Sequence, residues 1–429
     1  MPLLNKYFPM RKYITFSILC SIMLLNACKE KASDTTSNLP IIEVETAFQN
    51  PVELSLTDLG ETLTYIPLET NEASITDINP MTKVVVTHEF IFIGNTKASI
   101  LCFDRKTGKF LRTIGRFGQG PNEYLNGSLE VDSETKRIYV RNTPGNYVCF
   151  DFEGNALAPV TLPGEQNFMM GGHHFSHNKA YGYCNVANEK TTAEAYCYDL
   201  ASGELLDSIP LTDMQAKKTR SIAPLRSQEV YGGMFMMVEH EDGTWTGGNY
   251  QNNTFWTSNH TLYHKDIFCD TIFQMKDLQR QEPVAAFQLG SLGGYGRYET
   301  SSSMTGRYVI PRILYNGKHI YFTLFTDLYD IQGMMKKLTS GGVVLSPSCG
   351  IYNQQTGVVK LQKESLLLKH PNEAMPGVCI NTLATDGAWV GVYQIQELIE
   401  ARENIPTEQQ PDWLKNLKDD DNPVIVLIE

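Results

Sequence analysis

Apolar and polar residues alternate with a period of two along most of the chain, and short clusters of Gly, Asn and Asp interrupt the alternation. This period is typical of half-buried strands, and the interrupting residues favour tight turns. The pattern predicts antiparallel strands joined by hairpins. Residues 393–418 differ. There, Leu398, Leu414 and Leu417 predict a helix with these leucines facing inward, interrupted at its two prolines.

The alternating pattern also repeats. Residues 91–114, 138–162 and 181–211 each contain an apolar strand, an asparagine, a polar turn, a strand ending in Cys-aromatic-Asp, a Gly turn and a further strand. A fourth copy at 349–362 keeps the turn glycine and has Asn353 in place of the aspartate. A unit of roughly 40 to 50 residues with about four short strands is the signature of one propeller blade.

Six such units can be counted, so the sequence predicts an all-β fold. The expected architecture is a six-bladed β-propeller of four-stranded antiparallel blades with a short C-terminal helical insertion. The units cover residues 84–117, 130–163, 173–212, 230–276, 305–363 and 380–429. The sixth unit is short of strands. We therefore expect a strand from the other end of the chain to complete a sheet, and three segments are candidates: IIEVET (41–46), VELSL (52–56) and the terminal VIVLIE (424–429).

The N-terminus has the pattern of a processing segment. Arg11 and Lys12 precede an apolar run, residues 14–27, that is too short to cross a bilayer as a helix. The run ends in Leu-Asn-Ala-Cys, which resembles the lipobox of bacterial lipoproteins and implies lipidation of Cys28. An ordinary secretory signal with a chance cysteine is the alternative. Met10 lies closer to the positive residues than Met1 does, so it is favoured as the true start.

These patterns divide the chain into three parts. Residues 1–27 are the expected signal peptide, residues 28–40 the lipidated cysteine with a flexible polar tether, and residues 41–429 a single propeller domain. Lys29 replaces the aspartate that resembles an inner-membrane retention signal, so the outer membrane is the expected location. The membrane face toward which the domain projects stays open.

The stretch RFGQGPNEYLNG, residues 116–127, lies between the first two units, where the chain must cross from one sheet to the next. Its glycines and proline suit such a joint. GQGPNEY, followed by VDSETKRIYV and CFDFEGN, resembles the NHL-type repeat. Together with the lipobox, YIPLET (65–70) and NPVIVLIE (422–429), it resembles still more the six-bladed β-propeller lipoproteins of Gram-negative gut bacteria. The chain departs from NHL repeats at Asn95 and Asn142, where aspartate is common. This resemblance implies an architecture and an envelope location, but no reaction.

Composition narrows the class of protein. The chain has 429 residues, of which 42% are hydrophobic and 20% charged, so it is globular and not disordered. Its formal net charge of −12 argues against nucleic acid and against electrostatic attachment to anionic lipid. Cys102, Cys149 and Cys197 occupy equivalent positions in the repeat, and we expect them to be reduced, small packing residues.

Three groups of residues are candidates for a site. His173, His174 and His177 could bind zinc or copper, or could form a polar entry to the third unit. Aromatic and guanidinium groups on the glycine-serine loop 290–306 suit stacking against sugar rings or a polar polymer, or simply pack a long insert; they are Tyr295, Arg297 and Tyr298. The polar residues of the joint either shape it or contact a ligand; they are Arg116, Glu123 and Tyr124.

No catalytic motif is visible, so the sequence favours a membrane-anchored binding or scaffold module for a glycan, a peptide or an envelope partner protein. The sequence identifies no cofactor, and whether one is bound stays open. The alternative is a propeller enzyme, such as a lactonase or a glycan lyase or hydrolase. Such a site needs carboxylates or histidines from several blades, often around Ca²⁺. Three or more of these side chains meeting at one end of the channel would favour the enzyme.

Overall fold

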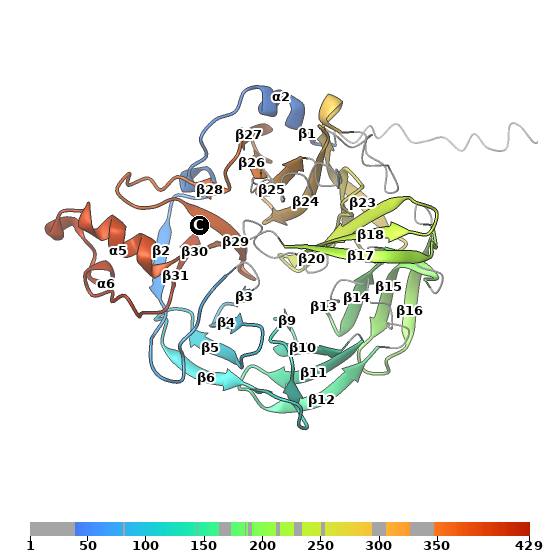
Figure 1. Ribbon diagram of the computed structural model, residues 1–429, viewed down its shortest axis with the longest axis horizontal. Coiled ribbons are helices and arrows are strands. Elements are labelled where there is room, and N and C mark those ends of the chain that lie inside the picture. The colour runs from blue at the N-terminus through green and yellow to red at the C-terminus, as the bar shows by residue number, and fades with distance from the viewer. Residues whose placement is uncertain are drawn as a thin grey trace, which may run out of the picture. The chain divides into compact units, whose positions relative to one another are not determined.

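The computed structural model describes residues 39–79, 82–143, 145–162, 173–184, 186–187, 191–211, 215–226, 234–249, 254–293, 306–326 and 347–429. The chain divides into two compact units, Met1–Leu39 and Pro40–Glu429. All the described strands and helices belong to the second unit. Its described residues form mainly β-structure: seven sheets of three to five strands and one two-stranded ribbon (Figure 1). The predicted all-β class is confirmed.

Five sheets contain four strands that follow one another in the chain, and they are numbered here in chain order. Sheet 1 comprises β3 (Lys83–Val86), β4 (Phe90–Gly94), β5 (Ile100–Asp104) and β6 (Phe110–Ile114). Sheet 2 comprises β9 (Leu129–Asp132), β10 (Arg137–Thr143), β11 (Asn146–Asp151) and β12 (Ala156–Thr161). Sheet 3 comprises β13 (His174–Ser176), β14 (Lys179–Tyr183), β15 (Ala193–Asp199) and β16 (Leu205–Pro210).

Sheets 4 and 5 have the same order. Sheet 4 comprises β20 (Phe255–Ser258), β21 (Thr261–His264), β22 (Thr271–Met275) and β23 (Gln281–Gln288), and β1 (Ile41–Glu43) adds a fifth strand parallel to β23. Sheet 5 comprises β24 (Tyr308–Tyr315), β25 (His319–Thr326), β26 (Pro347–Asn353) and β27 (Val358–Gln362). The two-stranded ribbon consists of β7 (Arg116–Phe117) and β8 (Glu123–Tyr124).

Sheet 6 combines strands from the N-terminal and C-terminal parts of the described chain. It contains β28 (Leu367–Leu368), β29 (Val378–Leu383), β30 (Trp389–Tyr393), β31 (Val424–Ile428) and β2 (Leu63–Pro67). β2 pairs antiparallel with β31, so the expectation that an N-terminal strand completes the last sheet is confirmed. The closing strand lies later than either N-terminal candidate. IIE joins sheet 4 instead, and VELSL forms no strand: it is held by the bridge between Ser55 and Lys369 and by a bond from Val52 N to Leu361 O.

The seventh sheet is a departure from the six expected units. It consists of β17 (Thr219–Arg226), β18 (Met234–His240) and β19 (Trp245–Asn249), inserted between sheets 3 and 4. The predicted fourth unit, 230–276, is therefore wrong in its bounds, because it runs from this extra sheet into sheet 4. Alternation shows where strands lie but does not show which strands are neighbours, so the two sheets could not be separated in the sequence.

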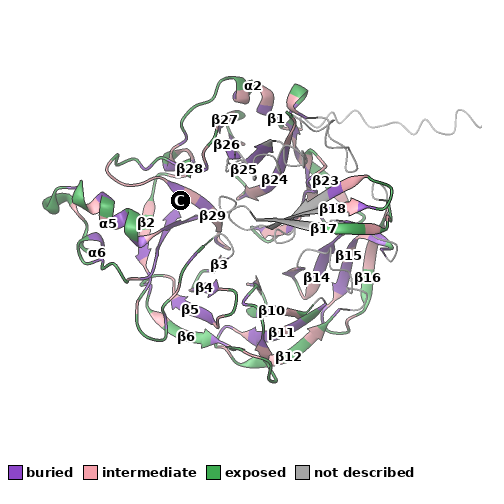
Figure 2. Ribbon diagram, in the orientation of Figure 1, coloured by how far each residue is buried: buried purple, intermediate pink, exposed green. Residues whose placement is uncertain are grey.

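Six buried apolar clusters each join two of the numbered sheets (Figure 2). One holds Phe92 of sheet 1 against Phe150 of sheet 2. The others join sheets 2 and 3, 3 and 4, 4 and 5, and 5 and 6. The sixth joins sheet 6 to sheet 1, with Ile425 and Val86 in one cluster. The order of packing thus returns to its start. Among the clusters of described residues, the extra sheet contributes only Val238.

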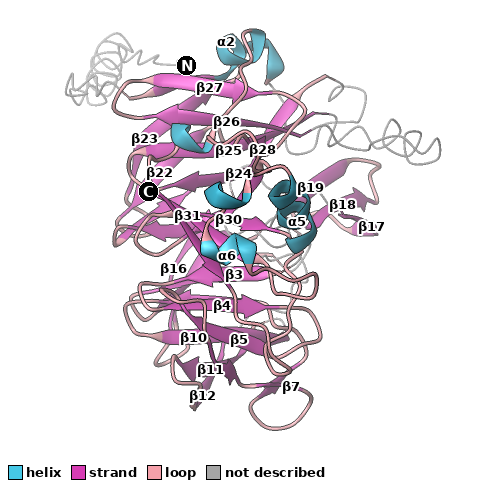
Figure 3. Ribbon diagram, turned by 90° about the vertical axis from the view of Figure 1, so that its left-hand side faces the viewer, coloured by secondary structure: helices cyan, strands magenta, loops and turns pink. Residues whose placement is uncertain are grey.

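Helices in the described part of the chain are few and short (Figure 3). They are α2 (Val44–Gln49), α5 (Ile395–Glu403) and α6 (Asp412–Lys415), with the single turns η1 (Leu56–Asp58), η2 (Gly290–Leu292) and η3 (Thr407–Gln409). The predicted C-terminal helical insertion is confirmed. Leu398, Leu414 and Leu417 are buried against sheet 6, and the helix is interrupted as expected at its two prolines. In the described part of the chain, no helix combines the length and apolarity that a membrane span requires.

The repeat residues have structural roles. Asp104, Asp151 and Asp199 each end the third strand of a sheet and accept backbone N–H bonds in the following turn. Asn353 does the same in sheet 5. The seven cysteines in the described residues have free thiols. Three of them lie on the third strands of sheets 1 to 3, as the repeat predicts, and burial raises the pKa of Cys102 to about 12.

Candidate functional site

Connections between strands alternate between two ends of the sheets, because successive strands are antiparallel. We call one end the hairpin end. There, the first strand turns into the second and the third into the fourth, with β29 counted as the first strand of sheet 6. We call the other the crossover end. There, the second strand connects to the third, and the chain passes to the next sheet. The candidate residues of this protein divide between these two ends.

Tight turns form the hairpin end. In sheet 3, His177 and Asn178 have φ of 52° and 59°, and in sheet 4, Asn259 and His260 have φ of 47° and 60°. Two consecutive residues with positive φ are what a two-residue type I′ hairpin requires, and Asn-Gly is the usual solution. A histidine in this conformation is uncommon. Each turn therefore places an imidazole at the tip of a hairpin at some cost in backbone strain.

Both imidazoles meet one carboxylate. Glu134 lies in the first turn of sheet 2, with Oε2 2.8 Å from His177 Nε2 and Oε1 2.7 Å from His260 Nδ1. The side chain of Glu134 is 27% exposed, and both imidazoles are more exposed than that. This carboxylate therefore joins the turns of three different sheets. It is the one place in the described residues where two histidines and a carboxylate from separate sheets are seen to meet.

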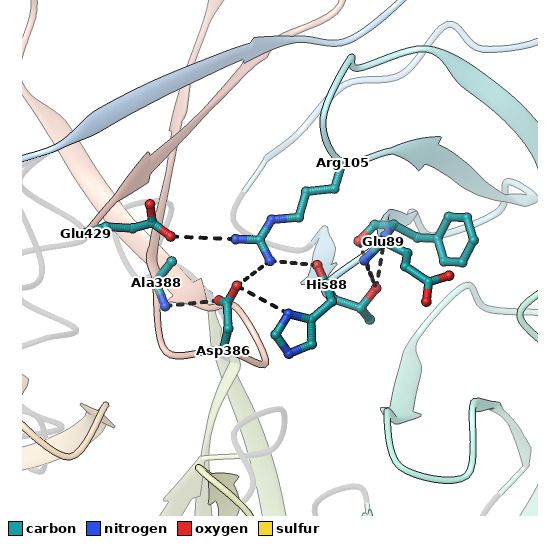
Figure 4. A network of polar contacts seen from close by, with 8 residues as sticks. His88, Glu89, Arg105, Asp386, Ala388 and Glu429 are labelled. Carbon is teal, nitrogen blue, oxygen red and sulfur yellow. Dashed lines mark hydrogen bonds and ion pairs between the residues drawn. The ribbon is translucent and has the colours of Figure 1, made fainter.

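Sheets 6 and 1 are joined at the same end by a more buried group (Figure 4). Arg105 Nη1 lies 2.5 Å from Asp386 Oδ2 and donates to Thr87 O at 2.9 Å. The side chain of Arg105 is only 12% exposed. His88 Nδ1 approaches the same carboxylate at 3.7 Å. The other first turns of the sheets also contact a neighbour, through Lys136–Glu89, Asn259–Asn316 and Asn316–Gly387.

Polar side chains also link the first strands of the sheets. Lys83 Nζ of β3 lies 2.7 Å from Glu130 Oε1 of β9, and His174 Nε2 of β13 lies 2.7 Å from Thr257 Oγ1 of β20. Burial lowers the pKa of His174 to about 4, so its imidazole is neutral at pH 7. Arg312 of β24 donates to two carbonyls at a bulge in β29. These contacts bridge alternate junctions between sheets.

At the crossover end, the joint after sheet 1 is held by Tyr124. Its hydroxyl accepts from Ile100 N at 2.7 Å and donates to Ile114 O at 2.6 Å. The side chain is fully buried, which raises the pKa of Tyr124 to about 12 and leaves it no surface for a ligand. Glu123 accepts from Gly120 N at 2.7 Å and so shapes the same loop. Of these three residues of the joint, Arg116 is the one exposed to solvent, with its side chain 81% exposed.

The three histidines singled out in the sequence do not converge. His173 Nδ1 lies 2.8 Å from the Tyr147 hydroxyl in the core, His174 meets Thr257, and His177 meets Glu134. In the part of the chain that the structure describes, no group of three His, Cys, Asp or Glu side chains is arranged to hold a metal ion. The sequence reasoning missed Glu134 and His260. Their only sequence signal was the Asn-His dipeptide between two alternating strands.

Long connections between strands and between sheets distinguish the crossover end. The connection from sheet 3 to sheet 4 holds the extra sheet, whose Lys217 N donates to Ala187 O and whose Val238 packs on Val186. The second and third strands of sheet 5 are separated by residues 327–346, and sheets 4 and 5 by residues 289–307. Three sequence candidates fall in the last connection but lie outside the described residues, as does Cys28: Tyr295, Arg297 and Tyr298.

Comparisons with known proteins identify a family and a similar fold. Residues 39–429 match the family described as a domain of unknown function, DUF4934. A crystal structure of a “Putative exported protein” from Bacteroides fragilis aligns with a TM-score of 0.57 and 11% identity, over 90% of this chain and 97% of that chain. The structures titled U3-55K and RRP9 WD40 repeats align with TM-scores of 0.38 and 12% identity, over 85% and 88% of this chain and 98% and 99% of theirs. The search of curated proteins finds no match.

Proposed function

The chain belongs to the DUF4934 family, and from this premise we propose that it is a lipid-anchored β-propeller of the cell envelope that binds its ligand at the crossover end. The ligand is a glycan, a peptide or an envelope partner protein. The proposed propeller has six blades, which are sheets 1 to 6, and the extra sheet lies outside the ring. The NHL-type character of the repeat stays a prediction.

Packing supports the six-bladed arrangement. Each numbered sheet shares one buried cluster with the sheet before it and one with the sheet after it, and the last cluster returns to sheet 1. The pairing of β2 with β31 joins the N-terminal and C-terminal parts of the domain in one sheet. Closure of this kind removes exposed strand edges, which is the problem that propellers solve.

Location is proposed from the N-terminus and the solved relative. The apolar run that ends in Leu-Asn-Ala-Cys supports a lipid anchor on Cys28, and Lys29 supports the outer membrane. The protein of similar fold from Bacteroides fragilis is described as a “Putative exported protein”, which agrees with a location outside the cytoplasm. The domain projects either into the periplasm or from the cell surface.

The observation that carries the binding role is the difference in length between the two sets of connections. Hairpin turns of a few residues bond to one another, whereas the crossover end carries the long connections and an added sheet. Binding residues concentrate on loops that a rigid scaffold positions. The strands that flank residues 289–307 end and begin at the crossover end, so Tyr295, Arg297 and Tyr298 are proposed ligand contacts there, with Arg116 as a further candidate.

A binding screen tests this proposal. The purified protein is titrated with oligosaccharides, peptidoglycan fragments and envelope peptides while its melting temperature is measured. A ligand at 100 times its dissociation constant adds about 2.7 kcal/mol to the free energy of unfolding. We expect Arg297→Ala or Tyr298→Ala to weaken binding of a hit, and Glu134→Gln at the hairpin end to leave it unchanged. A ligand lost only with Glu134→Gln would contradict binding at the crossover end.

One observation favours an enzyme as the second candidate. Glu134, His177 and His260 bring a carboxylate and two imidazoles from three sheets together at the hairpin end. Such groups can transfer protons in hydrolysis. The candidate reactions are those of a lactonase or a glycan hydrolase. Hydrolysis of a lactone or glycan by the wild type, reduced at least about 100-fold in Glu134→Gln, would support this role. Equal rates in both proteins would exclude Glu134 as its base or acid.

A further inference from the structure

The helical insertion of sheet 6 contains a hollow of about 670 Å³ that is open on one side. It lies between the C-terminal end of α5 and the start of α6, on the outer side of β30, β31 and β2 (Figure 1). Its lining is about equally polar and apolar; two residues carry a positive charge, and Glu403 carries a negative one. The lining residues are Arg402, Glu403, Asn404, Ile405, Pro406, Thr407, Gln410 and Lys415.

The walls of this hollow are fixed by packing and by hydrogen bonds. Leu398 and Leu414 hold the two helices in the buried cluster of sheet 6, and Trp413 stacks on Tyr65 of β2 with ring centroids 4.8 Å apart. Gln410 Nε2 donates to Arg402 O at 2.9 Å and to Ile405 O at 2.7 Å. The loop between the helices is therefore tied back to the end of α5. A ligand would meet a site that is already formed, which lowers the entropic cost of binding.

Arg402 is held by one end of its guanidinium. Nη1 lies 2.7 Å from Leu417 O and 3.3 Å from Leu414 O, so the side chain is fixed across the turn that follows α6. Nε and Nη2 have no protein acceptor among the described residues. A guanidinium presents its donors in a planar fork that matches the oxygens of a carboxylate or phosphate. One half of this fork is used by the protein, and the other half remains available.

Lys415 supplies a second positive charge to the same hollow. Its Nζ lies 3.8 Å from Asp412 Oδ1, which is a loose pair at an exposed position, since the aspartate side chain is 97% exposed. A pair of this kind is worth little and is easily exchanged for another anion. The protein as a whole has a net charge of −12, so two cations around one hollow differ from the average surface.

We propose that this hollow binds an anionic oxygen group, a carboxylate or a phosphate, through Arg402 and Lys415. The Arg402 fork fixes its orientation, Lys415 adds charge, and the amides and hydroxyl of Asn404, Thr407 and Gln410 line the remaining space. The hollow is open, so the group can belong to a small molecule or to a side chain or terminus of a partner. The helical insertion connects β30 to β31 and so belongs to the crossover end, but this hollow shares no residue with the ligand contacts proposed there.

Titration of the purified protein with glutarate and with inorganic phosphate tests the proposal, with sodium chloride at matched ionic strength as the reference. Binding is followed by calorimetry and by the melting temperature. We expect saturable binding of at least one anion. Arg402→Lys keeps the charge but loses the fork, so affinity should fall about 10-fold. Lys415→Gln should reduce affinity about threefold. The two anions distinguish a carboxylate from a phosphate site.

Lys418→Gln is the matched control, because this exposed lysine lies just after α6 but does not line the hollow. It should bind the anion as the wild type does. If Arg402→Lys fails to fold, Lys415→Gln and Lys418→Gln still decide the question. The proposal is overturned if neither anion binds saturably, or if Lys415→Gln and Lys418→Gln bind as tightly as the wild type.

Discussion

The two ends of the sheets are built by different means. At the hairpin end, the first turn of every numbered sheet bonds to a turn or side chain of another sheet. At the crossover end, the described joint after sheet 1 is held by burial, with Tyr124 as its centre. The difference shows that one end fixes how the sheets stand relative to one another, and that the other end can accept insertions.

A physical reason accounts for the difference. A two-residue hairpin sets the register of its strands, so a change in its length would move every side chain to the opposite face of the sheet. A connection that leaves the sheet has no such constraint, and lengthening it costs only about 0.6 kcal/mol per doubling. The extra sheet and the long connections of sheets 4 and 5 are all found where that freedom exists.

The largest expected effect is that of Gly115→Ala in the crossover joint. Gly115 has φ of 60°, and an added Cβ would lie 2.4 Å from Phe150 and 2.8 Å from Tyr124. Strain and overpacking together should lower the free energy of unfolding by about 3 to 5 kcal/mol in chemical denaturation. Gly357→Ala, at the hairpin end, is the control. Its φ of 70° is similar, but no atom lies within 4 Å of the added Cβ, so about 1 kcal/mol is expected. Equal losses would refute the role of packing at the joint.

Arg105→Ala should have the next largest effect, at the opposite end. It leaves Asp386 half-buried without its closest cation and Thr87 O without a donor. We expect a loss of about 2 to 4 kcal/mol in the free energy of unfolding. Arg116→Ala at the crossover end removes a side chain that is 81% exposed, and it should cost no more than about 0.5 kcal/mol. A small loss for Arg105→Ala would mean that the turn contacts do not hold sheets 6 and 1 together.

Removal of the extra sheet tests whether it belongs to the closed order of packing. A variant in which a short Gly-Ser linker joins residue 211 to residue 254 keeps all six inter-sheet clusters; among contacts between described residues, it loses the Val186–Val238 contact and the Lys217–Ala187 bond. It should unfold in one cooperative transition, with a loss of about 1 to 2 kcal/mol. Failure to fold, or two separate transitions, would place the extra sheet within the proposed ring, which would then have seven blades and not six.

Much of this fold could be predicted from the sequence, because its information is local. Strand alternation, the Asp turn at Asp104 and its equivalents, and the helix around Leu398 all depend on residues close in the chain. Pairing between segments that lie far apart in the chain was harder to predict. The candidates for closing a sheet were IIEVET, VELSL and the terminal VIVLIE. VIVLIE lies in sheet 6 as β31, but its N-terminal partner is Leu63–Pro67, because alternation alone cannot choose among short apolar segments.

The candidate sites were harder to predict, for the same reason. Three neighbouring histidines suggested one metal site, but a strand places successive side chains on opposite faces, so His173 and His174 point to different partners. Glu134 and His260 lie far apart in the chain, and only the folded hairpin turns bring them together. Residues that converge from separate sheets leave no spacing that a single sequence would show.

The smallest expected effect is that of Glu134→Gln, and it sharpens the account of the hairpin end. Glu134 joins three turns, but its partners are exposed, and exposed ion pairs contribute about 0.2 to 1 kcal/mol each. The free energy of unfolding of the variant should be lower by less than about 1.5 kcal/mol. Added salt should lower the stability of the wild type toward that of the variant. A matched variant, Glu130→Gln, removes the partner of Lys83 between the first strands of sheets 1 and 2, at a site of similar exposure. Both should behave alike if stability alone explains these contacts. A Glu134→Gln protein that is as stable as the wild type would show that these exposed contacts do not hold the turns of sheets 2, 3 and 4 together.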